Sequence, residues 1–373
     1  MKKLLLAAGA VALSGVLLAG CGKSEKGAAG DLIKIGVAGP MTGDQSKMGI
    51  DFKNGVELAV EEWNQKGGVL GKKIATVVGD DQHDPKQAVA VANKLVNDGV
   101  VGVIGHFNSS CSIPASSVYQ QTGIPMITPA STNPQLTEQG FQNIFRVCGR
   151  DDQQGRIAAD FVVNRLGKKR IAILHDKTTY GQGLSEELKK ALGDSIEVVA
   201  YEGVTQGDKD FKAVLSAIKT KKPEALYFGG VYPEAGLMVK QARELGIDAV
   251  FISGDGTIDT KFIEIAGAAA EGAYLTFSPD PNGIPTAKAF LESYHKKYGE
   301  HGPYSIYAYD AANILLNAIQ KAGATDGKKV AELIRATPHD GALGKVQFDA
   351  KGDVTVAPYV IWVTKGGKFE EMK

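Results

Sequence analysis

The sequence predicts an α/β fold made of two doubly wound lobes. Two observations predict it. Strand-like and helix-like segments alternate along most of the chain, an order typical of βαβ units whose parallel sheets are covered by helices on both faces. The length of 373 residues is also too great for one ordinary hydrophobic core and indicates about two domains.

The first part of the chain opens with a strand at residues 31–38, which alternate in polarity and then become apolar. A helix follows, because Phe52, Val56 and Trp63 recur at helical spacing, and Gly67 ends it. The next predicted segments are a strand, a helix that begins at a proline, and two further strands: 74–78, 85–97, 100–104 and 125–127.

The same alternation continues to the end of the chain. Further strand-like runs are 170–174, 196–201, 225–228, 249–252 and 273–276. The helix-like runs among them are 154–165, 184–192, 210–218, 235–245 and 259–265. Two longer helical patterns cover 285–298 and 305–322, and the short β segments at 344–348 and 358–363 suit closing strands or a crossing between lobes.

The N-terminus predicts export and lipidation. A basic start precedes a nearly uncharged run, residues 4–18, which is shorter than the roughly 20 residues that span a bilayer. The run ends in small residues before Cys21, so we interpret 1–20 as a lipoprotein signal peptide and Cys21 as the lipidated first residue of the mature chain. The alternative is a plain signal peptide with an incidental cysteine. Residues 21–30 are small, polar and Gly-rich, and they predict a flexible tether.

This N-terminus predicts a location outside the cytoplasmic membrane. No later stretch approaches 18 apolar residues, so the lipid is the only membrane attachment we expect. Disulfides are chemically permitted there. Cys111 and Cys148 are the candidate pair, and the alternative is two small buried thiols.

Composition and motifs exclude several classes of function. The 42 Lys and Arg are balanced by 42 Asp and Glu, whereas a nucleic-acid binder needs a surplus of cations. The chain has no nucleophile elbow, zinc-protease motif, phosphate-binding loop or dinucleotide fingerprint, and its six His are scattered. The acidic cluster at 80–84 suggests a metal, but we interpret Asp84 as a helix cap before Pro85. We therefore expect no cofactor, no metal and no enzymatic activity, but binding.

Three polar loops each follow a predicted strand, where ligands bind in open α/β sheets. The first loop, 105–110, leads into a predicted helix around 115–121, and the second loop is 128–134; both loops are rich in hydroxyl groups. Hydroxyls and free N–H groups at a helix start can receive a carboxylate. The third loop, 253–256, places Asp255 between glycines, where it can receive an ammonium group. Singly, each loop is more simply a cap or a turn, but together they match the two charges of an α-amino acid.

The chain resembles the branched-chain amino-acid (leucine/isoleucine/valine) substrate-binding proteins of ABC transporters. The resemblance covers almost the whole mature chain, and several blocks occur in the family's order: 80–81, 84–94, 103–106, 126–130, 175–177 with 180–181, 229–230 and 233–234. It implies a type I periplasmic binding protein fold with a three-segment hinge. The implied N-terminal lobe comprises 31–150 and 278–358, and the C-terminal lobe 151–277 and 359–373.

The resemblance also assigns expected roles to residues. Ser109 matches the family's carboxylate-binding serine, with Ser110 beside it, and Ala130 and Thr132 match positions that hold the carboxylate and the ammonium group. The family implies that Asp255 faces the ammonium group and that the second lobe contributes a tyrosine, here Tyr180. Phe107 matches an apolar position in the side-chain pocket.

The chain departs from the family at other positions. The best-known members have aromatic residues where this chain has Met48 and Val231, which leaves the preferred side chain open. They also join two cysteines at the positions of His83 and Asn108, so that disulfide is absent here.

The expected function is that of a monomeric, lipid-anchored protein that captures an aliphatic branched-chain L-amino acid by cleft closure and delivers it to an ABC permease. Within the same fold, the ligand could instead be another amino acid, an amide, urea or an aromatic acid. A sensor domain that signals through a separate receptor is a further alternative. A hydrolase is a third, although the chain lacks a recognisable nucleophile set.

Overall fold

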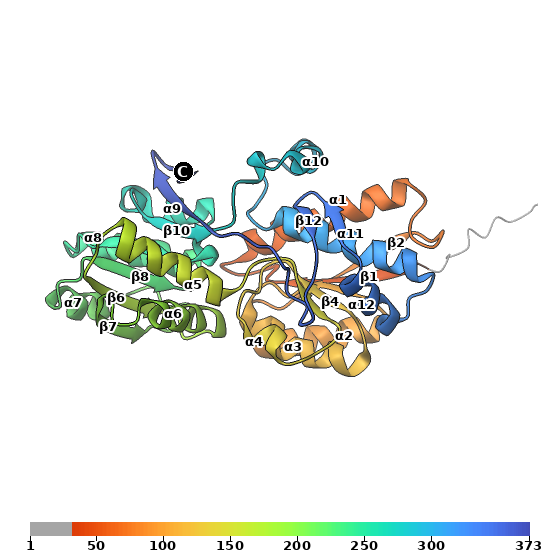
Figure 1. The fold of residues 1–373 in the computed structure, drawn as a ribbon, viewed down its shortest axis with the longest axis horizontal. Helices are drawn as coiled ribbons and strands as arrows, with labels where there is room; N and C mark the ends of the chain where they lie inside the picture. The colour runs from red at the N-terminus through yellow and green to blue at the C-terminus, as the bar shows by residue number, and fades with distance from the viewer. Residues whose placement is uncertain (1–31) are drawn as a thin grey trace, which may run out of the picture.

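A computed structural model of the protein describes residues 32–373. The predicted signal peptide, the tether and Cys21 lie outside the described residues. Within the described part of the chain, no helix is both long enough and apolar enough to cross a membrane. Two sheets with their helices lie side by side along the long axis of the molecule (Figure 1).

The first sheet has five parallel strands in the order β2-β1-β3-β4-β5. Their bounds are β1 Ile33–Gly39, β2 Ile74–Asp80, β3 Val103–Gly105, β4 Met126–Thr128 and β5 Ile144–Arg146. Its main helices are α1 Ser46–Gln65, α2 Pro85–Asn97, α3 Ser109–Thr122, α4 Gln135–Glu138, α10 Lys288–Tyr298, α11 Ser305–Ala322 and α12 Gly327–Ala336. Helices α1 and α11 pack together on one face of the sheet, and α2 and α3 on the other (Figure 1). We call this sheet and its helices the first lobe.

The second sheet has seven strands in the order β14-β13-β10-β9-β8-β6-β7, and only the pairings of β13 are antiparallel. Its strands are β6 Arg170–His175, β7 Glu197–Gly203, β8 Ala225–Gly229, β9 Val250–Ser253, β10 Tyr274–Phe277, β13 Val360–Lys365 and β14 Lys368–Glu371. Its helices are α5 Asp151–Asp160, α6 Thr179–Leu192, α7 Lys212–Thr220, α8 Tyr232–Glu244 and α9 Thr260–Ala266. Helices α5 and α6 pack together, as do α8 and α9. This sheet and its helices form the second lobe.

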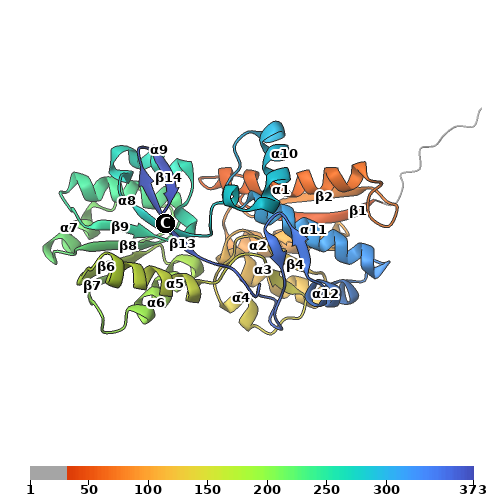
Figure 2. The same cartoon turned by 45° about the horizontal axis from the view of Figure 1, so that its top comes forward.

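The chain passes three times between the lobes. The passages run from β5 to α5, from β10 to α10, and from the hairpin β11 His339–Gly341 and β12 Gly344–Val346 to β13 (Figures 1 and 2). Because strands β1, β3, β4, β6, β8 and β9 are parallel within their sheets, their following loops emerge at the carboxyl edges. The three loops singled out in the sequence follow β3, β4 and β9.

The predicted fold class is confirmed, and the differences are local. The helical pattern at 305–322 coincides with α11, but α3 begins at Ser109, whereas the sequence pattern placed a helix only around 115–121. The residues Ser109 to Ser112 are poor helix formers with no apolar periodicity, so tertiary packing decides their conformation. The three-residue strand β5 and helix α12 were not predicted.

Candidate functional site

The first loop brings Phe107 and Ser109 to the start of α3. Both are buried, and Ser109 Oγ accepts a hydrogen bond from the backbone N–H of Asn133 in the second loop (3.2 Å). The hydroxyl of Ser110 is buried without a hydrogen-bond partner in the described chain. The first turn of α3 therefore combines two hydroxyls with the backbone N–H groups that every helix N-terminus leaves free.

The second loop is fastened to the first by hydroxyl groups. Thr128 Oγ1 donates to the carbonyl of His106 (2.7 Å), and Ser131 Oγ donates to the carbonyl of Phe107 (2.9 Å). These short side chains hold the two loops at a fixed separation. Because Asn133 N–H also donates to Ser109 Oγ, the second loop, which contains the buried Ala130 and Thr132, lies beside the first turn of α3.

Arg146, at the end of β5, supports the second loop from beneath. Its side chain is fully buried and donates to the carbonyls of Ser131 (2.9 Å) and Asn133 (3.0 Å). Its charge is balanced by an ion pair with Asp353. Burial opposes ionisation of Asp353, but Arg146 and Arg150 together lower the pKa of this carboxyl below its usual value.

Asp255, in the third loop, is buried and receives hydrogen bonds from three neutral side chains. Oδ1 accepts from Gln154 Nε2 (2.8 Å) and from the Tyr180 hydroxyl (2.7 Å), and Oδ2 accepts from the Tyr304 hydroxyl. Burial raises the pKa of Asp255, although the bonds from Tyr304, Gln154 and Tyr180 each lower it. No cationic side chain among residues 32–373 forms an ion pair with Asp255, which leaves a buried acidic group without a counter-charge.

Two glycines beside Asp255 allow this close approach. A Cβ at Gly256 would lie 2.8 Å from the Tyr180 ring, and one at Gly254 would lie 2.4 Å from Leu184 and 2.6 Å from Gln154 Oε1. The sequence pattern suggested that these glycines leave Asp255 accessible. In the structure only 2% of Asp255 is exposed, and the glycines instead make room for its hydrogen-bond donors.

Tyr304 is a site residue that sequence reasoning missed. It precedes α11 in the first lobe, yet its hydroxyl reaches Asp255 in the second. Its ring meets Phe107 edge-on (5.1 Å between centroids, 87°) and Phe277 in the same manner (5.4 Å, 82°). Tyr304 therefore joins the apolar wall around Phe107 to the acid of the third loop.

Asp151, at the start of α5, was also missed. It is fully buried, its backbone N–H donates to the carbonyl of Thr132 (3.0 Å), and neither carboxylate oxygen has a hydrogen-bond partner in the described chain. The hydroxyls of Thr132 and Tyr227 are likewise buried and unpartnered. Burial, together with the charge of Asp255, raises the pKa of Asp151. Unpartnered buried polar groups are unfavourable, so their gathering beside Thr132 indicates a place for a polar ligand.

Met48 and Val231, the positions of altered side-chain character, are both buried. Met48 lies near the start of α1, in the same apolar cluster as Phe107. Val231 precedes α8 and belongs to the second-lobe cluster that contains Tyr180. Each lobe thus has one buried non-aromatic residue at a position where the best-known members of the resembled family have an aromatic residue.

Polar contacts also join the rims of the two lobes. A first-lobe amide meets a second-lobe carbonyl, because Asn133 Nδ2 donates to Thr179 O (2.8 Å). The remaining pairs are Gln206 with His83 (2.7 Å), Lys209 with Asp44 (2.5 Å), Lys47 with Asp259 (3.5 Å) and the Tyr232 hydroxyl with the Asp44 carbonyl. The lobes therefore touch at several points besides the bond from Tyr304 to Asp255.

Cys111 and Cys148 are free thiols in buried positions, so the structure forms no disulfide between them. Cys148 Sγ instead donates to the carbonyl of Ser131 (3.6 Å), and burial raises the pKa of both thiols. Positions 83 and 108 are nevertheless joined through Gln45, which contacts His83 and accepts from Asn108 Nδ2 (2.9 Å).

In the acidic cluster at 80–84, carboxylates accept hydrogen bonds from backbone N–H groups. Asp84 caps α2 by accepting from the N–H groups of Lys86 and Gln87 (2.8 Å each), as the capping interpretation predicted. Asp81 accepts from His106 Nδ1 (2.8 Å). Among the described residues, no group of His, Cys, Asp and Glu is arranged to hold a metal ion.

Asp176, after β6, is a second-lobe carboxyl group whose ionisation is opposed by burial. It is 1% exposed; Oδ1 accepts from Thr178 N and Oγ1 (2.9 and 2.6 Å), while Oδ2 is unpartnered. Burial raises its pKa to about 7. A raised carboxyl pKa means that the folded state holds its proton longer than the unfolded chain, so stability falls as the pH rises from about 4 to about 7.

We therefore expect Asp176→Asn to raise the free energy of unfolding at pH 8 by on the order of 2–4 kcal/mol and to change it little at pH 4. Denaturant unfolding at the two pH values measures the difference. If Asp176→Asn changed the free energy of unfolding equally at pH 4 and at pH 8, Asp176 would not be a buried group that ionises between these pH values.

Comparison with known proteins gives consistent matches. The family described as "Periplasmic binding protein" matches residues 32–368. An "Amino acid binding protein" of Pseudomonas aeruginosa is 45% identical over 340 residues, which cover 90% of this chain and 91% of that protein. A "Leu/Ile/Val-binding protein homolog 2" of Brucella abortus is 44% identical over 338 residues, with coverage of 90% and 91%. The solved structure of the branched-chain amino acid transporter substrate-binding protein LivJ from Streptococcus pneumoniae, in complex with isoleucine, is similar with a TM-score of 0.84, 31% identity and coverage of 91% and 98%.

Proposed function

The chain belongs to the periplasmic binding protein family, and we propose that it captures an aliphatic branched-chain L-amino acid between its lobes and delivers it to an ABC importer. Members of this family bind solutes and are not enzymes. The solutes named for its relatives, leucine, isoleucine and valine, support the choice of ligand.

One observation carries the proposal: Asp255 is a buried carboxylate without a cationic partner in residues 32–373. Three neutral donors hold it in place but do not neutralise it. Oδ1 already accepts two hydrogen bonds and Oδ2 one, so Oδ2 keeps an acceptor position for a further donor. A primary ammonium group supplies both the charge and the donor. Asp151, with both oxygens unpartnered, adds a second acidic group on the same side.

The opposite end of the ligand has a complementary place. The hydroxyls of Ser109, Ser110 and Thr132 surround the N-terminus of α3, a helix of 14 residues whose free N–H groups and dipole favour an anion. We place the ligand carboxylate there and the ammonium group between Thr132 and Asp255. An aliphatic side chain would then lie toward Phe107 and Met48, and its burial would contribute about 1.5–3 kcal/mol.

Ligand capture then requires the lobes to close. Because Asp255 belongs to the second lobe while Ser109 and Thr132 belong to the first, a zwitterion contacts both only when they are together. The ligand shifts the equilibrium toward the closed arrangement because it binds the closed arrangement more tightly than the open one. Tyr304 adds to this coupling, since its hydroxyl crosses from the first lobe to Asp255.

The family implies a location outside the cytoplasmic membrane, and relatives that serve transporters support a permease as partner. We propose that a lipid on Cys21 anchors the protein, that it acts as a monomer, and that residues 31–150 with 278–358 and 151–277 with 359–373 move as the two bodies.

A thermal-unfolding screen against the common L-amino acids tests the function. A ligand at about 100 times its Kd adds about 2.7 kcal/mol to the free energy of unfolding, so an aliphatic amino acid should raise the midpoint by several degrees. A screen in which no amino acid shifts the midpoint would contradict the proposal.

A further inference from the structure

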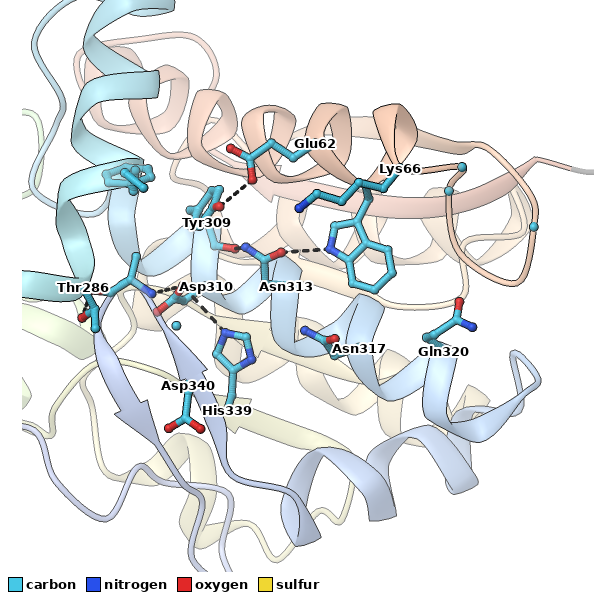
Figure 3. A pocket seen from close by; sticks show the side chains of 18 residues that line it. Glu62, Lys66, Thr286, Tyr309, Asp310, Asn313, Asn317, Gln320, His339 and Asp340 are labelled. Atoms are coloured by element: carbon cyan, nitrogen blue, oxygen red, sulfur yellow. Dashed lines mark hydrogen bonds and ion pairs between the residues drawn. The ribbon is translucent and has the colours of Figure 1, made fainter.

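A cavity of ≈860 Å³ lies in the first lobe, away from the proposed amino-acid site (Figure 3). It is bounded by α1, α11, the loop that follows α1, residues 286–290 and the β11–β12 hairpin. None of the residues proposed to hold the amino acid lines it. Its volume is within the range of small-molecule sites, about 300–1,000 Å³.

The walls of this cavity are fixed by internal hydrogen bonds. The Tyr309 hydroxyl donates to Glu62 Oε2 (2.6 Å), and Trp63 Nε1 donates to Asn313 Oδ1 (2.9 Å) (Figure 3). Asp310 is fully buried, and its carboxylate accepts the backbone N–H groups of residues 342 and 343 (2.9 and 2.7 Å). These bonds satisfy Glu62 and Asp310, and the other two charged lining residues, Lys66 and Asp340, are exposed to solvent, so the cavity does not need a charged ligand to balance a buried charge.

Three other side chains on the lining keep polar atoms without a hydrogen-bond partner in the described chain. Asn317 is half-buried, and its amide forms no hydrogen bond within residues 32–373. His339 Nε2 is buried without a hydrogen bond, 3.8 Å from Asp310 Oδ1. Gln320 uses its oxygen for the N–H of Leu70 (2.8 Å), which leaves its NH₂ group free. An amide, an imidazole and an NH₂ group thus offer both donors and acceptors.

A bare glycine keeps this space open beside the imidazole. A Cβ at Gly341 would lie 2.5 Å from both His339 Nε2 and Asp310 Oδ2. Trp63 adds a large, half-buried aromatic ring to the same lining, which also includes Asn317, Lys66 and Gln320 (Figure 3).

The lining selects a class of ligand. A flat indole favours a ligand with an apolar face, and amide and imidazole groups favour hydroxyls, which both donate and accept hydrogen bonds. The more buried charged groups of the walls, Glu62 and Asp310, already have partners, and the exposed Lys66 and Asp340 carry opposite charges; these two facts together disfavour a strongly ionic ligand. A ring that carries several hydroxyls on one edge and C–H groups on its face meets all these conditions.

We propose that this cavity is a second ligand site, for a neutral polyhydroxylated molecule of the size of a mono- or disaccharide. Trp63 stacks on the apolar face of the ligand, and Asn317, Gln320 and His339 bind its hydroxyls. The site is independent of the proposed amino-acid site and does not require it.

The chain allows a direct optical test because it has two Trp residues. The other, Trp362, lies in β13 of the second lobe, where its Nε1 donates to the Ser278 carbonyl (2.9 Å). In Trp362→Phe, Trp63 is the only indole and reports on the cavity. D-Glucose, maltose and N,N′-diacetylchitobiose are titrated into this variant while the emission of Trp63 is followed, and the wild-type chain is titrated by saturation-transfer NMR in parallel.

At least one of the three saccharides should bind saturably. Adding Asn317→Ala should weaken that binding at least about tenfold. Asn164→Ala removes an exposed amide from the second lobe and should leave the binding unchanged. Absence of binding by all three saccharides in both measurements would overturn the proposal. So would binding that Asn317→Ala does not weaken, because the saccharide would then lie elsewhere.

Discussion

Asp255→Asn should weaken the binding of an aliphatic amino acid by about 2–5 kcal/mol, which is roughly 30-fold to several thousand-fold in Kd. The substitution keeps the shape of the side chain but removes its charge. In the proposed complex the ligand ammonium is buried against this carboxylate, and a buried charge that loses its partner is strongly unfavourable. Titration calorimetry on the variant and the unchanged chain measures the ratio.

An analogue without the ammonium group provides the control. 4-Methylpentanoate has the carboxylate and the side chain of leucine, and for it the buried Asp255 is an unfavourable neighbour. We therefore expect Asp255→Asn to bind this analogue no more weakly than the unchanged chain does. Equal losses of leucine and of the analogue would show that the substitution damaged the fold rather than a charge contact.

The second large effect is expected at Arg146. Replacing it with Met should lower the free energy of unfolding by about 3–5 kcal/mol, because it breaks a buried ion pair with Asp353 and removes the guanidinium donor from the carbonyls of Ser131 and Asn133. These carbonyls belong to the second loop, so the affinity for the amino acid should fall as well. Denaturant unfolding followed by a leucine titration measures both.

Arg150 supplies a matched control, since it donates to the other oxygen of Asp353 (2.6 Å) from a more exposed position. Arg150→Ala should cost about 0–1 kcal/mol, as is usual for partly exposed pairs. The lowered pKa of Asp353 adds a pH signature: the stabilisation is present above about pH 4 and is lost as the pH falls through the folded pKa. Equal losses of unfolding free energy in the two arginine variants would contradict the claim that the buried Arg146 stabilises the fold more than Arg150 does.

Elements with a long periodic pattern were predictable from sequence. Helix α11 repeats its apolar residues over 18 positions, and its predicted limits agree with the structure. Strand β5 has three residues and becomes a strand only by pairing with β4, so no local pattern marks it. Helix α3 begins at Ser109 with residues of low helix propensity, and the packing of the first loop determines its start.

The candidate site was predictable where it depends on the order of the chain. Parallel strands place their following loops at one edge, and this predicted that the loops containing Ser109, Thr132 and Asp255 carry the site. Tyr304 and Asp151 were not predictable in this way. Tyr304 precedes a helix and Asp151 begins one, and both positions are ordinary for these residue types. Their importance arises from the approach of the two lobes, which a local pattern does not contain.

The central claim is that this protein recognises both charges of an aliphatic amino acid at one site. Calorimetric titration of the unchanged chain with L-leucine, L-isoleucine and L-valine, and with the singly charged analogues 4-methylpentanoate and 3-methylbutylamine, tests it most directly. The predicted result is saturable one-to-one binding of at least one of the three amino acids, and much weaker binding of either analogue. Binding of an analogue as tight as that of the amino acids, or binding of none of the three amino acids, would contradict the claim.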